Sequence, residues 1–209
     1  MSEKIQRFLS EKRRETPFLV LDLDLVVERY RLLKEALPTV GVYYAVKANP
    51  ADEIVVALER EGAGFDVAGI AELEGCARLG IPASRMSYGH TIKKEADIAC
   101  ARTAGIDLFA FDSKAELQKL ARAAPGSRVF CRIETQGDGA EWPLSKKFGC
   151  RIDIAEALLK DARDLGLEPY GVSFHVGSQQ TDPEQWDAAI AETAGLFRSM
   201  EKTGIELRL

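Results

Sequence analysis

Apolar residues in this chain fall into short runs, and no run shows a clean alternation of apolar and polar side chains. Unalternating runs of this kind are typical of parallel strands that are buried on both faces. From residue 42 onward the first five runs start about 20 residues apart, which is the length of one strand–helix unit. We predict strands at 18–21, 42–46, 65–68, 86–88, 108–111, 129–133, 171–176 and 205–209.

The stretches between these runs have the periodicity and the end signals of amphipathic helices. Asp22 lies where an N-cap belongs. Ser113 with Glu116, and Asp153 with Glu156, have the spacing of capping boxes. We predict helices from the N-terminus to about residue 15 and at 26–37, 52–60, 71–79, 92–103, 113–124, 153–165 and 182–204.

Repeated strand–helix units fit either a TIM barrel or a doubly wound sheet. No G-x-G-x-x-G segment follows the first strand, which disfavours the dinucleotide-binding variant. We count about six complete units and the start of a seventh, whereas a barrel needs eight. The chain ends inside the apolar run 205–209. We therefore expect an α/β fold, an incomplete (β/α)8 TIM-like barrel, with the polar loop 134–149 on its catalytic face.

Composition and charge exclude several classes of protein. The net charge is −5, and the densest basic cluster, residues 11–14, is short enough to be a solvated helix face. A nucleic-acid footprint is therefore not expected. No apolar run reaches the roughly 18 residues of a membrane span, and the N-terminus lacks the apolar core of a signal peptide. We expect a cytoplasmic protein.

The cysteines do not indicate a metal site. The four cysteines, Cys76, Cys100, Cys131 and Cys150, form no C-x-x-C pair, and the chain has only two histidines. Structural zinc sites need four such ligands at close spacing. We expect no bound metal, and we interpret the cysteines as reduced, mostly buried thiols.

Four ionisable residues lie at the ends of predicted strands. Lys47 ends one apolar strand, Asp66 lies in the next, Arg132 lies in 129–133, and His175 lies in 171–176. Barrel enzymes place catalytic groups at the carboxyl ends of their strands. Burial there lowers the pKa of an amine, so Lys47 would be a nucleophile for an aldehyde.

Each of the four residues also has a purely structural interpretation. A lysine can extend from a strand end into water, and a buried aspartate or arginine can form an ion pair without any ligand. A strand histidine is more often part of the core. The turn at Gly177 and Ser178 favours function for His175, because small residues let backbone amides approach a phosphate.

The surrounding motifs make the pattern specific. The segment A-V-K-A-N around Lys47 resembles the cofactor-lysine motif of the ornithine, lysine and arginine decarboxylases, which have an alanine-racemase-like barrel. The segments G-F-D-V-A around Asp66 with Glu72, C-R-I around Arg132, K-F-G at 147–149 and H-V-G-S at 175–178 also match, in order. The resemblance covers nearly the whole chain, and E-W-P-L-S at 141–145 is similar to the bacterial enzymes.

The resemblance implies pyridoxal 5′-phosphate as cofactor. Lys47 would form the Schiff base, His175 would stack on the pyridine ring, and Ser178 would bind the phosphate. Asp66, Glu72 and Arg132 would orient the lysine and the ring substituents. The substrate would be a basic amino acid, ornithine first and lysine second, decarboxylated to a diamine for polyamine biosynthesis.

The resemblance also has consequences for domain organisation. Residues 1–23 would be a helix and strand that pair with a C-terminal β domain lying beyond this chain, and residues 24–209 would be the partial cofactor-binding barrel. The family acts as a homodimer whose subunits complete each other's sites. We therefore expect residues 1–209 alone to be inactive. His90 stands where relatives usually carry asparagine, and we expect it to have little effect.

Two other functions fit the same residues. One is a non-catalytic barrel that binds the cofactor, or a regulatory decoy of a decarboxylase. A decoy would be expected to lose cofactor residues, yet Lys47, Asp66, Arg132 and His175 are all present. The other is a racemase with the same barrel, against which the H-V-G-S-Q and E-W-P-L-S segments speak.

Overall fold

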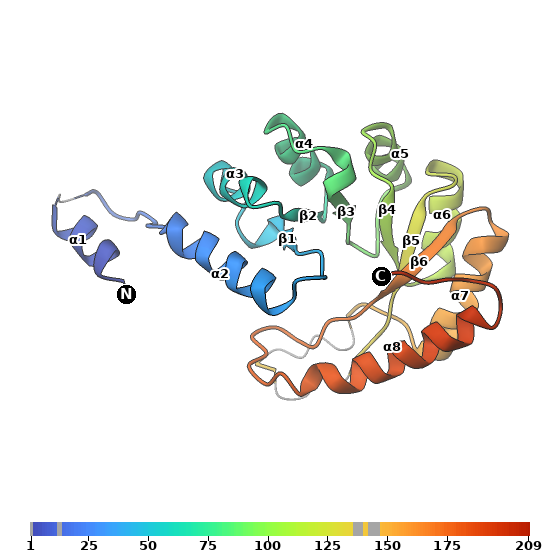
Figure 1. Ribbon diagram of the computed structural model, residues 1–209. Coiled ribbons are helices and arrows are strands. Elements are labelled where there is room, and N and C mark those ends of the chain that lie inside the picture. Colours follow the sequence, from blue (N-terminus) through green and yellow to red (C-terminus); the bar gives the residue numbers. More distant parts are fainter. Residues whose placement is uncertain (1, 12–13, 136–139, 142–146) are drawn as a thin grey trace.

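The centre of the molecule is a six-stranded parallel sheet. The computed structural model describes residues 2–11, 14–135, 140–141 and 147–209. The strands are β1 (Tyr43–Ala45), β2 (Gly64–Val67), β3 (Met86–Tyr88), β4 (Leu108–Phe111), β5 (Arg128–Arg132) and β6 (Glu168–Ser173). Their order in the sheet is their order in the chain. A doubly wound sheet reverses this order at a switch point, so the sheet is an arc of a barrel (Figure 1).

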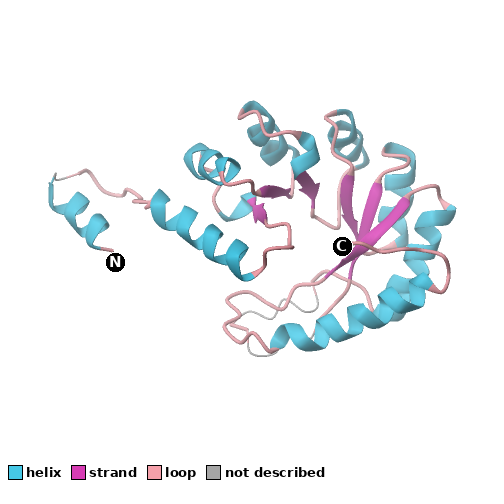
Figure 2. Ribbon diagram, viewed as in Figure 1, coloured by secondary structure: helices cyan, strands magenta, loops and turns pink. Residues whose placement is uncertain are grey.

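Helices cover the convex side of this arc (Figure 2). The helices of the described residues are α1 (Glu3–Glu11), α2 (Leu23–Ala36), α3 (Asp52–Arg60), α4 (Ile70–Arg78), α5 (Glu95–Thr103), α6 (Lys114–Ala123), α7 (Ile152–Asp164) and α8 (Gln185–Glu201), with short 3-10 turns η1 (Val46–Ala48) and η2 (Ala83–Arg85). Helices α3 to α7 follow the strands on the outside, whereas α1 and α2 extend to one side. The predicted strand–helix repeat is confirmed.

The strands bury side chains on both faces. In β4, Phe109 and Phe111 belong to the main core with the helices, whereas Leu108 and Ala110 form a smaller cluster with Phe130. Successive residues of a strand point to opposite faces, so the smaller cluster lies on the concave side of the sheet. This two-sided burial explains why the strand sequences do not alternate.

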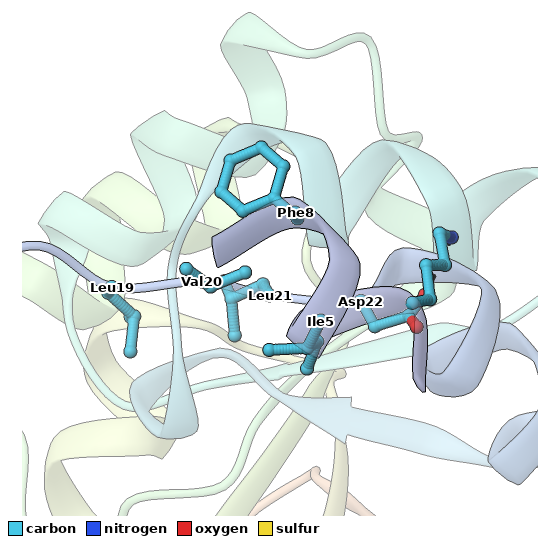
Figure 3. Close-up of a pocket in the computed structure, with 7 residues that line it drawn as sticks. Ile5, Phe8, Leu19, Val20, Leu21 and Asp22 are labelled. Atoms are coloured by element: carbon cyan, nitrogen blue, oxygen red, sulfur yellow. Dashed lines mark hydrogen bonds and ion pairs between the residues drawn. The ribbon is translucent and has the colours of Figure 1, made fainter. Parts of the chain in front are cut away.

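The strand predicted at 18–21 is wrong. These residues are not part of any strand, and Phe18, Leu19 and Leu21 are exposed. A strand needs a neighbour to satisfy its backbone groups, and the described residues place none beside this segment. It runs instead along α1, where Ile5 and Phe8 lie near Leu19–Leu21 (Figure 3).

The two predicted capping boxes differ in outcome. At α7, Asp153 pairs with Arg151 at 2.8 Å and Glu156 pairs with Lys160 at 2.7 Å, so this predicted capping box is wrong. The carboxylates of Asp153 and Glu156 are engaged in these surface ion pairs and do not cap the helix. At α6, the Ser113 hydroxyl accepts from the backbone N–H of Glu116 at 3.3 Å, as expected.

The segment 205–209 lies beside β6 without being a regular strand. The N–H of Val172 donates to the carbonyl of Leu209 at 2.8 Å, and the N–H of Arg208 donates to the carbonyl of Tyr170 at 2.7 Å. A Cβ on Gly171 would lie 2.0 Å from the Leu209 oxygen, so this approach requires glycine. The predicted strand at 205–209 is therefore not confirmed as a strand, although the segment lies next to β6.

Several expectations can be compared only with the described residues. Within them, no helix is long and apolar enough to cross a membrane, and no group of three or more His, Cys, Asp or Glu could hold a metal ion. Residues 136–139 and 142–146, which contain Gly137, Gly139, Pro143 and most of the E-W-P-L-S segment, lie outside the described residues, as do Lys12 and Arg13 of the basic cluster.

Candidate functional site

A cleft of about 400 Å³ lies on the concave side of the arc, at the carboxyl ends of the strands. Its walls come from all six strands and from residues that follow β1, β3 and β6. The side chains that carry chemistry along it are those of Lys47, Asp66, Ser87, Arg132 and His175. Four of these five were predicted from the sequence, and the parallel arrangement of the strands brings them together.

Lys47 lies in the 3-10 turn η1, directly after β1. It is exposed, so the expectation that it is buried is wrong. The turn is held from both sides: the Tyr44 hydroxyl donates to the carbonyl of Asn49 at 3.0 Å, and the Asn49 side chain accepts from the N–H of Ala51 at 3.1 Å. Among the described residues, the Lys47 ammonium has no hydrogen-bond or ion-pair partner, which leaves it available in the cleft.

Asp66 sits between its neighbours on the two adjacent strands. It is in register with Ala45 of β1 and Ser87 of β3. The Ser87 hydroxyl donates to Oδ1 of Asp66 at 2.7 Å. Burial raises the pKa of the Asp66 carboxyl, while the Ser87 hydrogen bond and the charge of Lys47 act in the opposite direction. The cleft therefore contains a desolvated carboxylate within electrostatic reach of the lysine.

Gly89 makes room for this carboxylate. A Cβ at this position would lie 2.2 Å from Oδ1 of Asp66, closer than any side-chain carbon can approach. Neither Gly89 nor Ser87 was singled out in the sequence, because a glycine and a single serine in a short strand are common in any fold. The alignment of the end of β3 with the end of β2 was the signal that could have found them.

Arg132 ends β5 and is held between an aromatic ring and a distant carboxylate. Its guanidinium lies 5.5 Å from the centre of the Phe148 ring. Burial lowers the pKa of Arg132, opposed by the charges of Asp112 and Asp66. Asp112 also accepts from the N–H of Gly149 at 3.0 Å. Gly149 has a φ of +100°, so the K-F-G segment depends on this glycine to present Phe148.

His175 follows β6 and has a fixed orientation. Its Nδ1 accepts from the backbone N–H of Gly177 at 2.9 Å, in a turn where Gly177 has a φ of +102°. Burial lowers the pKa of His175, as do the charges of Arg132 and Lys47. The neutral ring therefore carries its hydrogen on Nε2. It can present a flat face to a ligand in the cleft.

The two remaining predicted residues, Glu72 and Ser178, do not line the cleft. Glu72 lies in the first turn of α4, and its carboxylate accepts from the N–H of Ala68 at 2.8 Å. It thereby fixes the turn after β2. Ser178 is half-buried and follows the turn at Gly177.

His90 lies near the rim of the site. Its Nδ1 accepts from the N–H of Ile92 at 2.9 Å, and its ring meets the edge of Phe148 with 5.4 Å between centres. Burial lowers the pKa of His90, and the charges of Lys93 and Lys47 add to this effect. That this histidine has little effect on activity stays a prediction.

A second cavity, of about 300 Å³, lies between α1 and the segment 19–22 (Figure 3). It is lined mainly by apolar side chains, and its charged groups, Lys4 and Asp22, pair with each other at 2.9 Å. The N-terminal arm that holds it lies away from the strand ends (Figure 1). It brings no nucleophile or base together, so we do not consider it a catalytic site.

Comparison with known proteins identifies the family. The family described as "Pyridoxal-dependent decarboxylase, pyridoxal binding domain" matches residues 23–209. The chain belongs to this family. The resemblance seen in the sequence is confirmed, and the open arc is part of a decarboxylase barrel. The cofactor of the family is pyridoxal 5′-phosphate.

Three relatives show what the chain is similar to. It is 39% identical to a lysine/ornithine decarboxylase of Selenomonas ruminantium over 99% of this chain and 52% of that protein. It is 35% identical to the ornithine decarboxylase of Mus musculus, over 100% and 45%. It is 34% identical to antizyme inhibitor 2 of Xenopus laevis, over 100% and 46%. The chain thus spans about half the length of these relatives.

Solved structures agree with the fold. Lysine decarboxylase of Selenomonas ruminantium in complex with pyridoxal phosphate and cadaverine matches with a TM-score of 0.89 and 38% identity, over 99% of this chain and 52% of that one. Lysine/ornithine decarboxylase of Vibrio vulnificus in complex with putrescine matches with a TM-score of 0.85 and 33% identity, over 97% and 53%.

The residues of this cleft fit the cofactor chemically. A lysine ammonium without a partner among the described residues can meet an aldehyde, a neutral histidine can cover an aromatic ring, and a half-buried arginine can meet an anionic oxygen. The desolvated Asp66 supplies a negative charge or a proton within reach of Lys47.

Proposed function

We propose that the protein containing this chain decarboxylates a basic amino acid, with ornithine as the first substrate and lysine as the second. The product would be a diamine, putrescine or cadaverine, as in polyamine biosynthesis. The observation that carries the proposal is the gathering of Lys47, Asp66, Arg132 and His175 around one cleft of a decarboxylase barrel.

Each of these side chains has a proposed role. Lys47 would hold the cofactor through its amine, which has no competing partner among the described residues. The fixed ring of His175 would cover one face of the pyridine ring. Arg132 and Asp66 would orient polar substituents, and Ser178 would bind the phosphate beside the turn at Gly177. When bound, pyridoxal phosphate supplies the electron sink that decarboxylation needs.

The chain's own groups would also control where protons lie. Asp66 faces Lys47 electrostatically and is fixed by the Ser87 hydroxyl. A carboxylate held in this way can keep the lysine amine oriented and can take up or release its proton. Glu72 would act indirectly, since it holds the backbone of the turn after β2.

The substrate class is supported by the relatives. The two similar solved structures are complexes with cadaverine and with putrescine. The Selenomonas ruminantium relative is named for both lysine and ornithine. A diamine product implies a substrate whose second amine needs an acidic partner in the site.

A regulatory decoy is the second candidate. One relative at 34% identity is named an antizyme inhibitor rather than a decarboxylase. An enzyme and a decoy differ in what their cleft must contain, because a decoy does not need an available lysine. Lys47, Asp66, Arg132 and His175 are all in place here, which favours the enzyme.

For residues 1–209 alone we propose background turnover. The described residues form six strands, whereas a closed barrel has eight, so the sheet has open edges at β1 and beyond the segment 205–209, which pairs with β6. The homodimer and the cytoplasmic location expected from the sequence also stay predictions.

The test is CO2 release from ornithine, lysine, arginine and meso-diaminopimelate, using the whole natural protein with saturating pyridoxal phosphate. We expect turnover of ornithine and lysine, and visible absorbance from bound cofactor. Neither bound cofactor nor CO2 release would favour the decoy, whereas bound cofactor without CO2 release from any of these substrates would favour a non-catalytic cofactor-binding barrel. Faster turnover of meso-diaminopimelate would refute the substrate class. Residues 1–209 assayed alongside should stay at background.

A further inference from the structure

Two cysteines contact each other in the main core, behind the strand that carries Arg132. The sulfurs of Cys131 and Cys150 lie 3.7 Å apart, although the residues are 19 positions apart in the chain. A disulfide needs an S–S distance of about 2.05 Å, so the sulfurs would approach by less than about 2 Å. We propose that Cys131 and Cys150 are a redox site that forms a reversible intramolecular disulfide.

The backbone fixes the relative position of the two cysteines. Cys131 lies in β5, and Cys150 is in register with Ile133, which follows β5 and lies two residues after Cys131. The N–H of Cys150 donates to the carbonyl of Arg132 at 3.0 Å, and the N–H of Glu134 donates to the carbonyl of Cys150 at 3.0 Å. Because Cys131 is two residues out of register with Cys150, closing the bond needs a shift of the Cys150 backbone as well as side-chain rotation.

The two thiols have complementary exposure. Cys131 is buried, whereas Cys150 is half-buried and can be reached from solvent. Their contact lowers the pKa of Cys150 and raises the pKa of Cys131. Cys150, the more exposed thiol, is thus the one that ionises first. Cys131 lies beside it, which is the position of a resolving thiol.

The other two cysteines lack one or the other of these properties. Burial raises the pKa of Cys76 to about 11, which suppresses the thiolate that reacts. Cys100 is exposed on α5, but among the described residues no second sulfur contacts it. The pair is therefore distinct within this chain, and Cys100 serves as an internal comparison.

The reaction can be written with a peroxide as oxidant. The Cys150 thiolate attacks one peroxide oxygen, so an S–O bond forms, the O–O bond breaks, and hydroxide leaves and is protonated to water. The Cys131 sulfur then attacks the Cys150 sulfur. The S–S bond forms, the S–O bond breaks, and a second water leaves with the proton of Cys131. Two thiols are oxidised and one hydrogen peroxide is reduced to two waters.

The location ties the pair to the cleft wall. Cys131 precedes Arg132, and the Cys150 thiol also lies 3.6 Å from the Arg132 carbonyl. A bond between these cysteines would close around the backbone of Arg132, whose side chain lines the cleft. The inference does not depend on the proposed substrate, because it concerns only the two thiols.

The test is peptide mapping of the whole reduced protein after graded treatment with hydrogen peroxide. Remaining thiols are alkylated with iodoacetamide before and after reduction with dithiothreitol. We expect a Cys131–Cys150 cross-linked peptide that appears at or below the peroxide dose that oxidises Cys100, and that dithiothreitol removes. Cys100→Ser should keep the cross-link, and Cys150→Ala should abolish it.

Two results would overturn the proposal. The first is oxidation of Cys100 while Cys131 and Cys150 both remain alkylatable. The second is recovery of Cys150 as sulfinic or sulfonic acid with Cys131 still a free thiol, which would show that the partner does not resolve the first oxidation product. The wild-type protein gives both readouts, so the test does not depend on any variant folding.

Discussion

Two lysines follow strands of the same sheet in opposite surroundings. Lys47, after β1, is exposed in the cleft and has no partner among the described residues. Lys93, after β3, has a side chain that is 0% exposed, and its ammonium contacts Glu116 at 2.9 Å and the carbonyls of His90 and Ala110 at 2.8 and 2.6 Å. All three donors of Lys93 are used.

This difference separates a reactive amine from a structural one. Glu116, which also pairs with Lys119 at 2.5 Å, holds Lys93 between β4 and α6. Such a lysine fixes the segment that contains His90, but its amine has no free position for an aldehyde. If burial were the criterion, Lys93 would be the candidate for the cofactor lysine. An amine that is free at the cleft is the better criterion, and it identifies Lys47.

The largest expected effect is that of Lys47→Ala. In the whole protein with bound pyridoxal phosphate, borohydride treatment should leave no fixed adduct, and decarboxylation should fall to background, because no other amine lines the cleft among the described residues. Lys93→Met is the matched control and should keep the adduct. An adduct mapped to Lys93 in the Lys47→Ala variant would reverse our assignment of the two amines.

Lys93→Met should mainly affect stability. Removing Lys93 leaves the buried Glu116 with Lys119 as its remaining ion-pair partner, and two carbonyls lose their donor, so we expect a loss of roughly 3 kcal/mol in the free energy of unfolding. Urea denaturation followed by circular dichroism measures it. Adding Glu116→Gln to Lys93→Met should recover part of the loss. A double variant no more stable than the single one would argue against the pair.

The fold followed from the sequence because its cause is local. Each strand–helix unit carries its own apolar run and its own end signals, so the order of β1 to β6 could be predicted. The segment 18–21 failed because a strand needs a neighbour, which apolar residues alone do not provide. The capping box at Asp153 and Glu156 failed because Arg151 and Lys160 compete for the carboxylates.

The site was predictable where a residue's chemistry is unusual for its place. Charged residues at the ends of apolar strands pointed to Lys47, Asp66 and Arg132, which the structure brings to one cleft. Gly89 and the Cys131–Cys150 contact were not predictable in this way, because they depend on distances between elements. The same holds for Lys93, whose burial follows from the arrangement of β4 and α6.

Asp66→Asn tests the group that faces Lys47. The amide keeps the size of the side chain and can still accept from Ser87, but it loses the negative charge. We expect a fall in turnover of about a hundredfold, typical of losing a proton-transfer group, with little loss of stability because burial already disfavours the charged form. Asp52→Asn, at an exposed pair with Arg78, is the control and should leave turnover unchanged. Equal turnover of the two variants would remove Asp66 from the site.

The smallest effect concerns the pH dependence of stability. Burial lowers the pKa of Lys93 from 10.5 to about 8, although Glu116 acts in the opposite direction. Between these values the unfolded chain binds more protons than the folded chain, so the free energy of unfolding must rise with pH in this window and change little below it.

From pH 8 to 9 we expect wild type to gain roughly 1 kcal/mol relative to Lys93→Met. Parallel profiles for wild type and Lys93→Met, measured by urea denaturation at each pH, would show that Lys93 does not lose its proton in the folded protein.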